Sequence, residues 1–170
     1  HNELMARLKE ERPPFNIVER LNRFMQRTIG ETGMFLTMVM ADVDLGLGNL
    51  VVSNAAHPDV FIWKKETNSL EAIKSHVPAV GFGMKMVGDP GETKTSIATG
   101  DRIVMFTDGF PETQNQDGQM LKLNGLREIV QKHVHLPTGE FIDAVFKSVD
   151  EFRAGVEPED DQTLAVVEIK

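Results

Sequence analysis

Cysteine is absent from the 170 residues, which excludes disulfides and cysteine-based zinc sites. A chain without cysteine suits the reducing conditions of the cytoplasm. No apolar run approaches the roughly 18–20 residues that a membrane-spanning helix requires, and the first residues lack the apolar core of a signal peptide. We therefore expect a cytoplasmic protein that makes no direct contact with a membrane.

Basic residues are the minority, with 18 Lys and Arg against 26 Asp and Glu and a net charge of −8. A surface of this charge repels nucleic acid, so nucleic acid is not an expected partner. The excess of carboxylates is compatible with a site that concentrates divalent cations, although solubility is the simpler explanation. The length fits a single domain, residues 1–170, with a core of its own.

Several familiar motifs of phosphate-binding, nucleophilic and zinc sites are missing as well. The chain has no phosphate-binding Walker loop, no serine nucleophile elbow and no cysteine nucleophile. Its internal histidines form no pair with the spacing of zinc ligands. Nothing in the sequence therefore points to a covalent enzyme intermediate.

Apolar spacing predicts one helix, then three β-hairpins, then two helices and a last strand. The first helix opens at Pro13 and Pro14, and residues 1–11 resemble the end of an earlier helix. The later helices begin at Asn124, as an N-cap, and near Thr138. The hairpins pair residues 35–43 with 49–53, 60–63 with 69–73, and 93–98 with 102–107, and the last strand covers 162–169. This order indicates an α+β fold without βαβ units.

Two acidic clusters lie at strand ends. Thr107-Asp108-Gly109 follows the apolar run of residues 103–106, and the glycine lets another group approach the carboxylate closely. Residues 157–163 lead into the last strand and contain four carboxylates. Taken singly, an Asp-Gly turn or an acidic loop is more often structural. Together the clusters suit a hard divalent cation if the fold brings the two strands side by side.

A third polar cluster is Asn54-Ala55-Ala56-His57-Pro58. The residue before a proline is held extended or in a turn, so His57 is expected to project from a loop. It could orient a phosphate or a water, and a structural role in the turn is slightly favoured. Asp42 and Asp44 lie at a hairpin turn and are interpreted as structural.

Five short motifs, in order, resemble the bacterial SpoIIE-type branch of the PPM (protein phosphatase 2C-like) family. They are Leu21-Asn22-Arg23 for its "LN", residues 54–58 for "NAGHP", 80–83 for "LPLG", 106–113 for "TDG…E" and 160–164 for "DDxT". Each motif is weak alone. Their order and spacing extend over nearly the whole chain, which makes the resemblance specific.

The resemblance implies an αββα sandwich of two antiparallel sheets flanked by helices, with two Mg²⁺ or Mn²⁺ ions held by aspartates at one end. Asp108 and Asp160 match the family's C-terminal catalytic metal aspartates. Gly109 matches the small neighbour that leaves room for a water at the metal. Asp161 matches a residue of the metal site that lies behind the direct ligands. Hydrolysis by water needs no covalent intermediate, in agreement with the missing nucleophile motifs.

The family's two N-terminal aspartate motifs, "GGD" and "GDVxGHG", are not in this sequence. We therefore expect a domain truncated at its N-terminus, with the family's function belonging to a longer parent. That function is hydrolysis of phosphoserine or phosphothreonine on a regulatory protein, in this branch a STAS-type anti-sigma-factor antagonist. The family also implies an upstream sensor or receiver domain, and a homodimer is possible. The alternative is a degenerate, non-catalytic phosphatase fold that binds a partner protein.

Overall fold

The computed structural model describes residues 13–75, 77–82 and 91–170, and the expected helix end at residues 1–11 lies outside them. The described strands form two sheets, with strand orders β1-β2-β5 and β4-β3-β6-β7. Each of the five strand pairings is antiparallel. The chain divides into two compact units, residues 1–57 with 74–97 and residues 58–73 with 98–170, and each is described by itself below.

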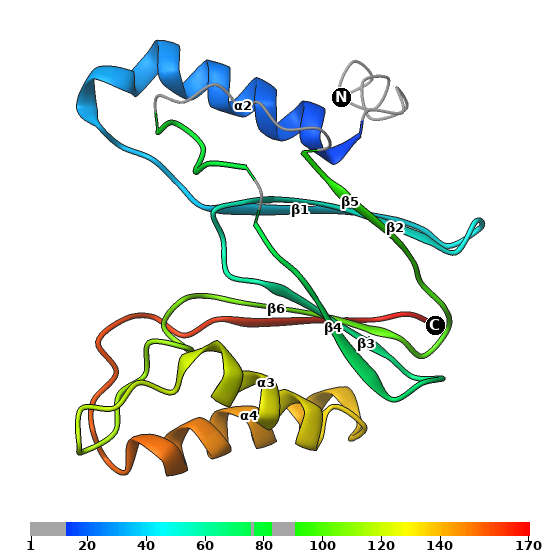
Figure 1. The fold of residues 1–170 in the computed structure, drawn as a ribbon, viewed down its shortest axis with the longest axis vertical. Helices are drawn as coiled ribbons and strands as arrows, with labels where there is room; N and C mark the ends of the chain where they lie inside the picture. Colours follow the sequence, from blue (N-terminus) through cyan, green and yellow to red (C-terminus); the bar gives the residue numbers. More distant parts are fainter. Residues whose placement is uncertain (1–12, 76, 83–90) are drawn as a thin grey trace. The chain divides into compact units, whose positions relative to one another are not determined.

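The first unit is a three-stranded sheet with one long helix against it (Figure 1). Helix α2 has prolines at its N-terminus, as expected, and its buried residues Val18 and Met25 pack with Ala55 and Val80. The short 3-10 helix η1 follows it. The bounds are Pro14–Ile29 for α2, Gly30–Thr32 for η1, Met38–Asp44 for β1, Asn49–Ala55 for β2 and Thr93–Ser96 for β5.

Two of the motif segments meet in this unit. The buried side chain of Asn22, from α2, accepts a 2.8 Å hydrogen bond at its Oδ1 from the amide of Gly81. Gly81 has φ of +91°, a conformation that side-chain-bearing residues rarely adopt. The asparagine thus binds a turn that its glycine makes possible, which gives both residues a structural reason to be present.

The second unit is a four-stranded sheet with two helices packed side by side against it (Figure 1). Its core contains Phe61 and Val104 from the sheet together with Leu126, Phe141 and Val145 from the helices. The bounds are Val60–Lys64 for β3, Ser69–Ile73 for β4, Arg102–Phe106 for β6, Lys122–His133 for α3, Thr138–Arg153 for α4 and Leu164–Glu168 for β7. The expected α+β class, with antiparallel sheets and helices, is confirmed.

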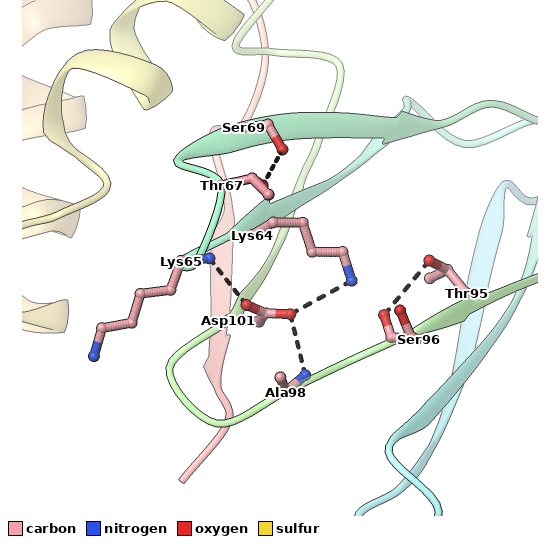
Figure 2. Close-up of polar contacts among 8 residues, drawn as sticks. All are labelled: Lys64, Lys65, Thr67, Ser69, Thr95, Ser96, Ala98 and Asp101. Atoms are coloured by element: carbon pink, nitrogen blue, oxygen red, sulfur yellow. Dashed lines mark hydrogen bonds and ion pairs between the residues drawn. The ribbon is translucent and has the colours of Figure 1, made fainter.

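The third predicted hairpin is wrong. Its two strands, β5 and β6, exist but belong to different sheets, because β5 pairs with β2 and β6 pairs with β3 and β7. The buried Asp101, in the connection between them, accepts hydrogen bonds from the amides of Lys65 at 2.9 Å and Ala98 at 3.1 Å (Figure 2). Its side chain fixes the connection to the β3–β4 turn, so the chain does not fold back on β5.

The predicted N-cap of the second helix is also wrong. Helix α3 begins at Lys122, so Asn124 lies within its first turn. The amide of Lys122 donates to the carbonyl of Pro111 at 2.7 Å, and Leu121 is buried in the core. Tertiary contacts therefore start this helix, where local propensity predicts an asparagine cap.

Arg102, the first residue of β6, joins the helices to the sheet. Its Nη1 donates to the carbonyls of Val134 at 2.5 Å and Leu136 at 2.6 Å, and its Nη2 contacts Glu168 Oε2 at 3.0 Å. The guanidinium also lies 5.8 Å from the ring centroid of Trp63. These contacts hold the α3–α4 connection against β6 and β7.

Candidate functional site

The loops that carry the two acidic clusters leave the same end of two neighbouring strands. The pairing of Phe106 with Leu164 places the end of β6 beside the start of β7. Asp108 lies two residues after β6, and Asp160 lies four residues before β7. The expected adjacency of the two strands is therefore confirmed, whereas the role of the two carboxylates as metal ligands stays a prediction.

Thr107 fixes the second loop to the first. Its amide donates to the carbonyl of Thr163 at 3.1 Å, which extends the β6–β7 ladder by one bond. Its hydroxyl donates to the carbonyl of Asp161 at 2.8 Å and accepts from the amide of Thr163 at 2.9 Å. The main chain of the acidic loop is thus bound on both sides of Gln162.

The segment after β6 is a closed turn. The amide of Phe110 donates to the carbonyl of Thr107 at 3.2 Å, and the amide of Glu112 donates to that of Asp108 at 3.0 Å. Phe110 is fully buried in the core of the second unit. Backbone hydrogen bonds close the turn around Asp108, and the buried Phe110 anchors it in the core. The backbone of Asp108 therefore has a defined position.

Gly109 allows the two loops to approach at the level of the main chain. A Cβ at this position would lie 2.6 Å from the carbonyl oxygen of Asp161 and 3.2 Å from that of Asp160. Real Cβ atoms essentially never come as close as the first of these distances. In the structure, the room that Gly109 leaves is taken by this main chain, where the sequence interpretation places a water.

The carboxylates themselves face solvent. Asp108, Asp160 and Asp161 are all exposed, and Asp160 Oδ1 accepts a 2.7 Å hydrogen bond from the amide of Asp161. No hydrogen bond or ion pair of the Asp108 carboxylate occurs among the described residues. An exposed carboxylate on a fixed backbone, with no ion pair to the described part of the chain, is available to bind a cation from solution.

The exposed carboxylates are the right type of ligand for the metal that the sequence predicts, but they are too few to bind it alone. Carboxylate oxygens are what Mg²⁺ and Mn²⁺ prefer. Within the described ranges, however, no group of three or more His, Cys, Asp or Glu side chains is placed to hold a metal ion. If Asp108 and Asp160 hold a metal ion, further ligands from outside the described residues are needed to complete its coordination.

Two of the remaining polar candidates, His57 and Asp44, have structural partners in the first unit. His57 Nδ1 lies 3.2 Å from the hydroxyl of Thr37, and the His57 amide donates to Asn54 Oδ1 at 3.0 Å. Asp44 Oδ1 accepts from the amide of Leu47 at 2.9 Å, as expected for an aspartate in a hairpin turn. Asp42, which was expected at the hairpin turn, lies instead within β1 opposite Val51, and its side chain is exposed.

Two residues near the carboxylates were missed by sequence reasoning. Gln162 and Thr113 both contact the carbonyl of Gly109, at 3.0 Å and 2.8 Å. For Thr113 a signal exists, because a threonine four residues after a carbonyl commonly donates its hydroxyl back to it. For Gln162, whose partners are 49 and 53 residues away, no local signal exists.

A family model described as "Stage II sporulation protein E (SpoIIE)" matches residues 1–170. The chain belongs to the SpoIIE family. This membership agrees with the resemblance of the five ordered motifs and with the antiparallel α+β architecture.

Individual relatives are distant in sequence and similar in fold. Phosphoserine phosphatase RsbU of Bacillus subtilis is 22% identical over 157 residues, which cover 92% of this chain and 45% of that protein. Thus the chain spans about half of this curated relative. The SiaA-PP2C domain of Pseudomonas aeruginosa superposes with a TM-score of 0.82 at 16% identity, covering 96% of this chain and 64% of that one.

The phosphatase domain of SpoIIE from Bacillus subtilis, presoaked with Mn, superposes with a TM-score of 0.63 at 20% identity. The match covers 99% of this chain and 72% of that domain. At such identities the superpositions show the fold alone. None of the helices in the described part of the chain has both the length and the apolar content needed to cross a bilayer.

Proposed function

We propose that this SpoIIE-family segment is part of a metal-dependent serine/threonine protein phosphatase. The observation that carries the proposal is the pair of exposed carboxylates, Asp108 and Asp160, on hydrogen-bonded loops at one end of adjacent strands. The relative named as a phosphoserine phosphatase supports the same reaction. The proposed substrate is a phosphorylated regulatory protein, of the STAS type that the sequence resemblance implies.

In this proposal Asp108 and Asp160 hold Mg²⁺ or Mn²⁺ together with aspartates outside this segment. The bound cations would supply the Lewis acid that makes phosphate ester hydrolysis possible at neutral pH. The residues of this chain contribute negative charge at fixed positions. Thr107 keeps the acidic loop against the end of β6, and Gly109 leaves room for the main chain of that loop. This close approach of the two loops supports a site that Asp108 and Asp160 would share.

The parent is proposed to be longer than the 170 residues and to have a sensor or receiver domain upstream, with a homodimer as a further possibility from the resemblance. A cytoplasmic location is proposed with it. A parent that supplies further aspartates from outside this segment would be consistent with the shortage of metal ligands among the described residues. The same shortage favours the rival function, a non-catalytic module that binds a partner protein.

The experiment that separates the two functions compares the full-length protein with the 170-residue chain. Phosphate release from a phosphoserine-containing STAS protein is measured as Mn²⁺ is raised. We expect Mn²⁺-dependent release by the full-length protein and almost none by the short chain, since two carboxylates bind these ions weakly. Full-length protein that binds the phosphoprotein without hydrolysing it at any Mn²⁺ concentration would instead establish the binding module.

A further inference from the structure

Gln162 connects the acidic loop to the turn that presents Asp108. Its side-chain Nε2 donates to the carbonyl of Gly109 at 3.0 Å and to the hydroxyl of Thr113 at 2.7 Å. The Thr113 hydroxyl in turn donates to the same Gly109 carbonyl at 2.8 Å. The hydroxyl is therefore an acceptor for one bond and the donor of another, which is the full use of its single proton.

This arrangement mirrors that of Thr107 on the other side. Thr107, directly before Asp108, binds the carbonyl of Asp161 in the opposite loop. Gln162, directly after Asp161, binds the carbonyl of Gly109 in the loop of Asp108. Each loop thus holds the main chain beside the other loop's carboxylate.

The contacts of Gln162 lie where water competes poorly for them. Thr113 is only 6% exposed, Gly109 is buried and Gln162 is half-buried. The amide of Gln162 also brings no charge. A lysine or arginine could donate to the same carbonyl, but its positive charge would pair with Asp108 and Asp160 and compete with a bound cation.

We propose that Gln162 and Thr113 are positioning residues, which act through the Gly109 carbonyl to set Asp108 at a defined separation from Asp160. The inference rests on the proposed phosphatase function. The Asp108 carboxylate has no hydrogen-bond partner of its own among the described residues, so its position depends on the backbone that carries it. Groups that orient metal ligands in this way typically change metal affinity by about 10–100-fold when removed.

The test uses the full-length protein with Gln162→Met and Thr113→Val, which keep the side-chain volume and remove the hydrogen-bonding groups. Thr113→Ser restores the hydroxyl. Gln116→Met is the matched control, because Gln116 Nε2 donates to the carbonyl of Ala154 at 2.7 Å without contacting Gly109 or Thr113. Mn²⁺ binding is measured from the electron paramagnetic resonance signal of free Mn²⁺, alongside phosphate release and metal-free thermal unfolding.

We expect Gln162→Met and Thr113→Val to raise the Mn²⁺ concentration for half-maximal binding by about 10-fold. Thr113→Ser and Gln116→Met should remain near the wild-type value. Wild-type Mn²⁺ affinity in Gln162→Met overturns the inference, and so does an equal loss in Gln116→Met, because that would reflect general loosening.

If Thr113→Val does not fold, Gln162→Met decides the question, since its side chain is half-buried in a loop before β7. Failure of the proposed function looks different from failure of this inference. A wild-type protein that neither binds Mn²⁺ nor releases phosphate removes both. An active wild type with an unaffected Gln162→Met removes only the positioning role.

Discussion

Strand β6 has ionisable residues at both of its ends, and the two ends hold them in opposite ways. At its start, Asp101 is 4% exposed and Arg102 is 6% exposed. Asp101 accepts from two backbone amides and contacts Lys64 Nζ at 3.4 Å (Figure 2). Arg102 donates to two carbonyls and to Glu168. Both charged side chains at this end are therefore bound by other groups of the protein.

At the other end, main-chain and hydroxyl groups around Asp108 form the hydrogen bonds, and its carboxylate forms none with the described residues. Thr107, Gly109 and Thr113 are bound through their main chain or hydroxyl groups, while the carboxylate next to them faces solvent. A buried charge must be paired, because desolvation is costly, whereas an exposed charge without a partner costs little to keep. The start of β6 is therefore structural, whereas its other end presents an exposed carboxylate that pairs with none of the described residues.

Replacing Asp108 by Asn should cause the largest effect, on activity. Asparagine has nearly the same shape but no charge, so the cation site loses an anionic ligand while the turn remains intact. In the full-length protein we expect Mn²⁺-dependent phosphate release to fall by about 100-fold or more, with the circular dichroism spectrum unchanged. The control is Asp117→Asn, another exposed aspartate, from the hairpin loop after the turn. Full activity of the Asp108 variant would contradict its assignment to the site.

Replacing Arg102 by Met should give the largest loss of stability. The change leaves the carbonyls of Val134 and Leu136 without the Arg102 donor and removes the ion-pair partner of Glu168. Removing one member of such a buried network costs about 3 kcal/mol. Urea unfolding of the protein measures the difference, and Arg20→Met in α2 provides a comparison for an exposed arginine. Equal losses in the two variants would erase the distinction between buried and exposed charges.

Replacing Asp101 by Asn should destabilise by about 2 kcal/mol. An asparagine has one oxygen and one NH₂ group, so it can accept at only one of the two positions. If its oxygen accepts from the Lys65 amide, its NH₂ group faces the donors Ala98 N–H and Lys64 Nζ. In the opposite orientation the NH₂ group faces the Lys65 amide. The same substitution at Asp108 should change the free energy of unfolding by less than about 0.5 kcal/mol. Measuring both by urea unfolding sharpens the contrast between the two ends, and similar values would remove it.

A smaller, pH-dependent effect is expected at Glu168. The hydrogen bond from Thr138, supported by the charge of Arg102, holds the pKa of this carboxyl below its ordinary value. The folded state therefore favours the ionised form, so the stabilisation is present above the ordinary glutamate pKa, about 4.3, and is lost as the pH falls through the lower, folded-state pKa. Glu168→Gln should unfold with a shallower acid dependence than wild type, as followed by thermal unfolding between neutral and acidic pH. Parallel acid profiles for the two proteins would contradict this.

Many of the helices and strands can be predicted from local sequence. Three kinds of short-range signal predict elements that are present. They are the prolines at the start of α2, the apolar spacing of α4, and the turns of the β1–β2 and β3–β4 hairpins. The connection around Asp101 is different. Its residues are typical of a hairpin turn, and they lead to another sheet because a buried carboxylate binds the backbone of Lys65, which is distant in sequence.

For the candidate site, the order of residues is enough to show which carboxylates are present, that they flank predicted strands, and that no cysteine is available. The folded chain adds that the two acidic loops are neighbours, that Gly109 makes room for the main chain of Asp161, and that Gln162 binds across them. The physical reason is that strand order and side-chain contacts between residues some fifty positions apart arise from long-range pairing and packing, which leave no periodic signal in the local sequence.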